Sequence, residues 1–190
     1  MTTQLTRTRL AFALLGLLAS LLIPPRVHAT TLRYQTVDQL AQDAELVVWG
    51  HVSRVGTRME RVAGGGLRPA REARVDVREA LLGQASGALA VQLLGGAHRG
   101  GERRVHGEAE LREGEEVVLF LTRSGGELRV LGMGMGVLRV VRPPNGAPRL
   151  LRQLDDAALL DAQGRVLPAL DESLSFDELR AAIGRARQAP

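Results

Sequence analysis

The chain has 190 residues, with 25 basic side chains that are all arginine, 21 acidic ones, and no cysteine or lysine. Without cysteine it has no disulfide framework and no lipoprotein anchor, and without lysine it has no P-loop. Arg7, Arg9 and Arg26 lie in the first 29 residues, so the remainder carries 22 arginines against 21 carboxylates, a net charge of +1. This near-zero total gives no electrostatic reason to expect nucleic acid or an anionic membrane as a partner.

Residues 1–29 have the pattern of a cleavable secretory signal peptide. A basic head precedes the apolar run 10–23, Pro24 and Pro25 break that helix, and Val27, His28 and Ala29 form a small-residue cleavage site. The apolar run is shorter than the ~20 residues that cross a bilayer. We therefore expect export to the periplasm or the medium, with no stable membrane insertion after cleavage. The alternative is an uncleaved anchor.

The first half of the remaining chain predicts one short helix and three strands. Thr36 and Gln39 have the spacing of a capping box before an apolar helical stripe. Residues 46–55 are rich in β-branched side chains, and residues 73–78 alternate between apolar and charged, so both segments are expected to be strands. Between them, residues 59–71 are expected to form a loop. Another strand is expected over residues 89–93, after a turn at 83–87.

The second half predicts a hairpin, further strands and a terminal helix. Residues 95–114 form a long polar loop, and residues 115–123 and 128–131 form the hairpin. Asn145 and Gly146 suit a tight turn with positive φ between two more strands, and Gln163 and Gly164 form a weaker turn. The helix begins at a capping box from Ser175 to Glu178.

Five or six short strands with helices only at the ends predict a mainly β fold. We expect a small antiparallel, OB-like barrel or curled sheet with a short N-terminal and a C-terminal helix. An open sheet under the two helices is the alternative. The expected organisation is a signal peptide over 1–29, a β-barrel-like domain over 30–155 and a C-terminal extension with the terminal helix over 156–190.

The long loop carries the best candidate ligand-binding residues, which are His98, Arg99, Arg103, Arg104 and His106. With Glu102 and Glu108 they suggest an anion or metal site, because imidazoles and carboxylates are common ligands and a loop can bring them together. Their spacing matches no zinc pattern, and a solvated charged loop is the alternative. Gly132, Gly134 and Gly136 alternate without opening a helix, so they predict a bulge or sharp corner rather than a phosphate-binding loop.

Several stretches together resemble a group of small exported bacterial β-barrel proteins. These stretches are residues 45–52, 75–83, 114–121 and 131–136, within a resemblance that covers roughly 40–141. Such barrels are similar to the OB-type module of metalloproteinase inhibitors and netrins. That inhibitor family binds the protease zinc through a disulfide-bonded N-terminal cysteine, and this chain has no cysteine. The resemblance therefore implies a fold and not that mechanism.

No catalytic motif is present, and we assign no catalytic residue, metal ligand or cofactor. The leading hypothesis is an exported, non-enzymatic binding module whose partner is another exported protein. The alternative hypothesis is a metal-dependent or other hydrolase that uses loop residues 95–114.

Overall fold

The computed structural model describes residues 30–61, 65–98, 101–103 and 105–188. The expected signal peptide lies outside these residues. Within the described part of the chain, no helix has the length and apolar character needed to span a membrane.

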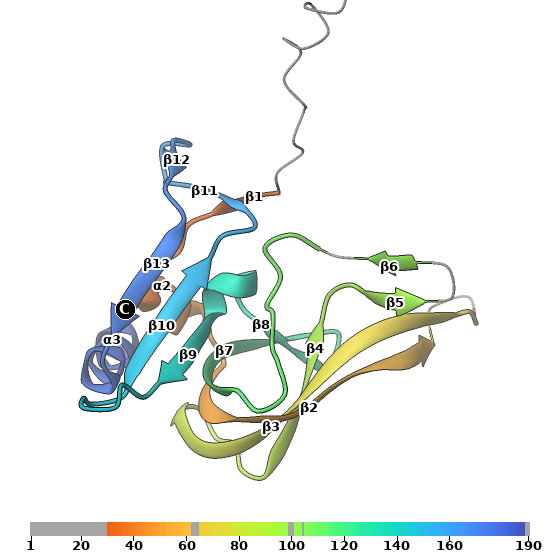
Figure 1. Ribbon diagram of the computed structural model, residues 1–190, viewed down its shortest axis with the longest axis horizontal. Helices are drawn as coiled ribbons and strands as arrows, with labels where there is room; N and C mark the ends of the chain where they lie inside the picture. Colours follow the sequence, from red (N-terminus) through yellow and green to blue (C-terminus); the bar gives the residue numbers. More distant parts are fainter. Residues whose placement is uncertain (1–29, 62–64, 99–100, 104, 189–190) are drawn as a thin grey trace, which may run out of the picture.

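Five strands close into a barrel (Figure 1). They are β2 (Leu46–Arg61), β3 (Leu67–Leu82), β4 (Ala88–Leu93), β7 (Glu116–Ser124) and β8 (Glu127–Val130). The strand order β2-β3-β4-β8-β7 returns to β2, and every neighbouring pair is antiparallel except β4 and β8. This ring confirms the predicted small OB-like barrel, and its closure pairs strands that would otherwise leave apolar edges open.

The barrel interior is filled by side chains that alternate along each strand. Val48, Val75, Val91 and Leu119 are fully buried there, and Arg74, Asp76 and Arg78 point to solvent as the sequence pattern predicts. Ala109 and Leu111 join this core, although both lie in the loop that was expected to be a polar excursion. The second half of that loop therefore packs against the barrel interior.

The hairpin of β2 and β3 is much longer than the sequence suggested. Residues 59–71 were expected to form a loop, but the pairing continues to Arg61 opposite Leu67. The prediction was wrong because Gly and Pro residues were taken as loop signals. Pro69 fits this strand because β3 pairs with β4 only from Arg71 onward, so the missing amide of proline interrupts no ladder on that side.

Beyond the barrel, the sheet continues as an open flank. It consists of β9 (Val137–Val141), β10 (Arg149–Leu154) and β13 (Leu170–Leu174), added in that order beside β7. The β9–β10 connection runs from residue 142 to 148, and neither Asn145 nor Gly146 has a positive φ. The predicted turn is present, since the Gly146 amide donates to the Pro143 carbonyl at 3.4 Å. Only the expected positive φ was wrong, because a connection of this length needs no left-handed residue.

Two helices cover the outer face of the barrel and flank (Figure 1). They are α2 (Val37–Asp43) and α3 (Phe176–Gln188). Both expected capping boxes are present: the Gln39 amide donates to Thr36 Oγ1 at 3.2 Å, and the Glu178 amide donates to Ser175 Oγ at 3.2 Å. The apolar stripes of the two helices pack on Val47, Phe120 and their neighbours. A second core therefore lies outside the barrel.

The remaining elements are a small sheet, a short 3-10 turn and a separate hairpin. The parallel pair β1 (Thr31–Arg33) and β11 (Ala158–Leu160) is joined by β12 (Val166–Leu167), and η1 (Met133–Gly136) is a short 3-10 turn. The turn begins after Gly132, whose φ of 68° is left-handed, as expected for a sharp corner. A separate small hairpin consists of β5 (Gly96–His98) and β6 (Gly101–Arg103). Because β13 pairs with β10, the segment after residue 155 contributes a strand to the sheet that includes the barrel.

Candidate functional site

A cleft of about 490 Å³ lies where the barrel meets the open flank. Its walls come from the loop that precedes β7, from η1 and β9, from the end of β10 and from the start of β13. The lining residues are Glu108, Glu110, Arg112, Glu115, Gly134, Val137, Arg139, Gln153, Leu154, Asp155, Asp156, Ala169, Leu170 and Asp171. Four separate parts of the chain thus build one concave surface.

The apolar part of this lining is held in place by close backbone packing. Leu154 and Leu170 are buried in the third apolar cluster of the protein, together with Met135 of η1. Gly134 allows η1 to approach them, since a Cβ there would stand 2.7 Å from the Leu154 Cδ1. The Gly134 amide also donates to the Gly107 carbonyl at 2.8 Å. The glycine that the sequence marked as a bend therefore fixes one wall of the cleft.

Carboxylates dominate the polar part of the lining. Six of the lining residues are acidic and two are arginine, which gives the cleft a formal charge of −4. Arg139 is held within the wall, because its Nη2 donates to the Glu110 carbonyl at 2.7 Å and its Nε lies 3.4 Å from Glu115 Oε1. Asp155 is exposed and makes no hydrogen bond or ion pair with the other described residues. The electrostatic field in the cleft therefore favours a cation.

Glu108 anchors the loop at the inner end of this cleft. Its Oε1 accepts a hydrogen bond from the Leu94 amide at 2.9 Å, and only 9% of the residue is exposed. Burial raises the pKa of this carboxyl, while the Leu94 amide and the nearby Arg71 and Arg129 oppose the rise. Because this carboxyl accepts a hydrogen bond from the amide directly after β4, it holds the loop against the barrel.

Of the five candidate site residues that the sequence grouped together, only His106 has a side chain within the described part of the structure. His98 lies in β5 and Arg103 in β6, while Arg99 and Arg104 are outside the described residues. His106 is exposed beside the cleft, with its Nδ1 3.9 Å from Asp156 Oδ2. Across the part of the chain that the structure describes, no three histidine, aspartate or glutamate side chains are placed to hold a metal ion.

The acidic wall after β10 and at β13 was missed by sequence reasoning. Asp155 and Asp156 stand next to each other between two apolar segments, and Asp171 follows buried Leu170. The adjacent aspartates are a visible signal, but only the pairing of β10 with β13 brings Asp171 opposite Gln153, whose amide donates to it at 3.1 Å. Long-range strand pairing, which no local pattern specifies, creates the site.

The outer face of β3, β4 and β8 is a second polar surface, but its charges pair with one another. Arg58 bonds Glu127 and lies 3.0 Å from Glu72, while Arg129 donates to Gln92 at 2.5 Å. The protein's tryptophan is elsewhere: Trp49 packs on Phe176 at 4.8 Å between ring centroids and donates to Glu116 at 2.8 Å. A face without aromatic side chains lacks the platform on which OB-type proteins stack bases.

Comparisons of the chain with protein-family models, with curated proteins and with solved structures found no match. The resemblance to the modules of metalloproteinase inhibitors and netrins therefore stays a prediction.

Proposed function

We propose that the protein is an exported, non-enzymatic binding module whose acidic cleft accepts a basic side chain of another exported protein. The observation that carries this proposal is the combination of an apolar wall and a carboxylate-rich rim in one cleft. An arginine or lysine side chain has the matching chemistry, because its aliphatic stem packs on apolar surface while its charged head stays with polar partners.

The size and composition of the cleft support a side-chain ligand. About 490 Å³ lies in the range of sites that enclose small molecules or a few side chains. Asp155 and Asp171 are exposed at the rim, where carboxylates are accessible to an incoming guanidinium. Arg139 is already held by Glu110 and Glu115, so its position is set before a ligand arrives.

Export of the module is supported by the three-part pattern of residues 1–29. The competing hypothesis, a hydrolase that uses loop residues 95–114, has weaker support. Within the described part of that loop, Glu108 is occupied by the Leu94 amide and His106 faces solvent beside Asp156. A hydrolase would need these groups to converge on a reacting atom.

Binding of a labelled peptide tests the proposal. A short peptide with two arginines separated by glycine is compared with the same peptide carrying citrulline, which keeps the shape of arginine and removes the charge. We expect the arginine peptide alone to bind, with affinity that falls as salt is added. Asp155→Asn and Asp171→Asn should each weaken binding by about two- to five-fold, whereas Asp76→Asn, an exposed carboxylate on β3 away from the cleft, should change nothing.

Equal binding of the citrulline peptide, or an equal effect of Asp76→Asn, would contradict a cation-selective cleft. Metal analysis of the purified protein addresses the hydrolase directly. A stoichiometric metal that is lost in His106→Ala would support the enzyme and overturn the binding module.

A further inference from the structure

The last strand of the open flank has a free edge. β13 is the terminal member of the eight-stranded sheet, and among the described strands it pairs only with β10. Figure 1 shows β13 as the outermost strand on that side of the sheet. Alternate residues of such an edge point their amide and carbonyl groups away from the sheet, where they can pair with one more strand. With five residues, β13 is long enough for a short extended segment to add beside it.

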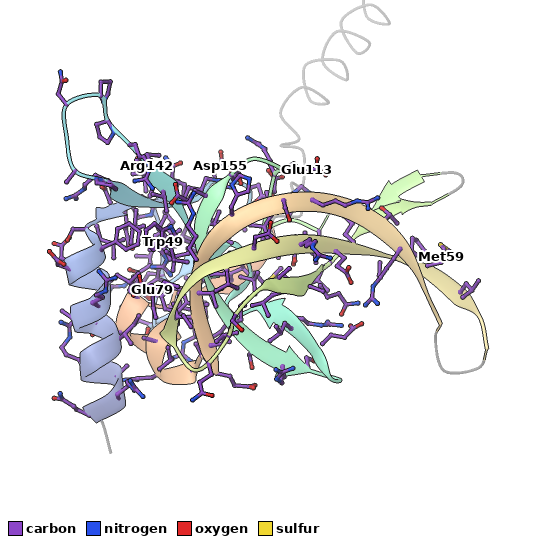
Figure 2. All side chains as sticks on the ribbon, turned by 90° about the horizontal axis from the view of Figure 1, so that it is seen from below. Trp49, Met59, Glu79, Glu113, Arg142 and Asp155 are labelled. Atoms are coloured by element: carbon purple, nitrogen blue, oxygen red, sulfur yellow. The ribbon has the colours of Figure 1, made fainter. Side chains whose placement is uncertain are left out.

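This free edge borders the acidic cleft. The lining of the cleft includes residues 169–171, at the start of β13. Asp155, another lining residue, directly follows β10. Figure 2 shows Asp155 between Arg142 and Glu113 in that view. A strand added beside β13 would therefore run past the rim of the cleft and bring its side chains there.

The exposed face of β13 favours a basic neighbour near the cleft. Asp171 is exposed, and the hydrogen bond it accepts at 3.1 Å comes from the uncharged amide of Gln153. Glu172 lies on the opposite face, where its Oε2 is 3.0 Å from Nη1 of buried Arg152. Side chains of an added strand stand about 5 Å from those opposite them. A basic side chain opposite Asp171 would therefore form an ion pair on the exposed face.

The other end of β13 and the strand's own sequence limit which segment can add. Arg149 donates to the hydroxyl and the carbonyl of Ser173 at 3.1 and 3.2 Å, so a guanidinium already occupies that end of the exposed face. A second copy of β13 is disfavoured, because antiparallel pairing about its midpoint would set the two Glu172 side chains directly opposite each other. The edge thus favours a basic strand near Asp171 over a copy of itself.

We propose that the ligand is an extended basic segment of the partner protein, which adds to the sheet as a strand beside β13. Its main chain pairs with the free edge, and two basic side chains one residue apart project on the same face, toward Asp171 and Asp155. The inference rests on the proposed cation-binding cleft and adds the conformation and position of the ligand. Main-chain pairing supplies affinity that the carboxylates alone do not, because an exposed ion pair contributes little.

Another free edge in the same chain provides an internal control. β12 is the terminal strand of the three-stranded sheet, and its described partner is β11. Its two residues, Val166 and Leu167, are apolar, so β12 itself carries no carboxylate for a basic strand. A basic segment that recognises charge as well as a free edge should leave β12 unchanged.

Binding of backbone-methylated peptides to the exported, processed protein tests the added strand. The parent peptide has about seven residues, slightly more than β13, with two central arginines separated by glycine. One version is N-methylated at both arginines, and the other at the three residues beside them. In a strand these two sets of amides point to opposite edges. We expect one methylated version to bind at least ten-fold more weakly than the parent, because its hydrogen bonds to β13 are lost, and the other to bind within about two-fold.

Amide hydrogen exchange locates the added strand. Bound parent peptide should slow exchange at alternate residues of β13 and leave β12 unchanged. Equal binding of the parent and both methylated peptides would overturn the added strand, and the cation-selective cleft would still stand if the citrulline peptide fails to bind. No binding of the parent peptide would contradict the cleft itself and the added strand with it. Slower exchange in β13 at high protein concentration without peptide would also overturn the inference, because it assigns the edge to a second copy.

Discussion

Arg152 is the buried residue whose replacement should cost the protein most. It lies on β10 with none of its surface exposed. Its Nε donates to the Met135 carbonyl at 2.8 Å, its Nη2 donates to the Gln35 carbonyl at 2.5 Å, and its Nη1 lies 3.0 Å from Glu172 Oε2. One guanidinium thus connects β10 to η1, to the segment before α2 and to β13.

The cost of Arg152→Ala follows from these contacts. Two backbone carbonyls lose their donor, at about 1–2 kcal/mol each, and the lost packing of the stem adds about 1–2 kcal/mol. We expect a loss of about 3–6 kcal/mol in the free energy of unfolding, close to the cost of removing one partner from a buried ion pair. For a domain of this size the melting temperature should fall by roughly 10 °C.

Urea unfolding followed by Trp49 fluorescence and by circular dichroism measures this cost. Arg149→Ala is the control on the same strand, because its guanidinium bonds Ser173 at the exposed surface and should contribute less than about 1 kcal/mol. The reasoning fails if Arg152→Ala and Arg149→Ala lie within about 1 kcal/mol of each other.

Two further predictions concern glycine packing and pH. Gly136→Ala should destabilise the protein strongly, because a Cβ there would stand 2.0 Å from the Leu131 carbonyl oxygen. A Cβ at Gly184 in α3 meets nothing within 4 Å, so Gly184→Ala should stabilise the protein by about 0.5–1 kcal/mol. Thermal melts of both variants test these two expectations. Burial raises the pKa of the Glu108 carboxyl, so the folded protein favours its protonated form. The stability that this group contributes is therefore present below the ordinary pKa near 4.5 and is lost as the pH rises. Glu108→Gln should therefore gain stability relative to the parent between pH 4 and pH 7, and parallel urea curves with no relative gain would contradict this.

Local patterns in the sequence were sufficient to predict much of the fold. The capping boxes at Thr36 and Ser175 were correct because their side chains satisfy backbone amides three residues away, with no help from the rest of the chain. The alternation of Val75 with charged neighbours correctly identified the inner and outer faces of β3. These features depend on contacts within a few residues.

Other features depend on partners far along the chain, and the sequence did not reveal them. Pro69 suggested a loop, although an unpartnered strand edge accommodates it. Leu111 was placed in a polar loop, but it packs inside the barrel beside β2 and β7. Asp155 and Asp171 were not grouped, because only the pairing of β10 with β13 brings their segments together. The candidate site arises entirely from such long-range contacts.

Mapping where an arginine peptide binds tests the central claim most directly. A titration of the isotope-labelled protein with the two-arginine peptide, followed by backbone amide NMR shifts, reports each residue of the cleft separately. We expect saturable shifts at Gly134, Val137, Asp155 and Asp171, and none with the citrulline peptide. Shifts confined to the outer face of β3 and β4, or no saturable shift at all, would contradict the cleft as the binding site.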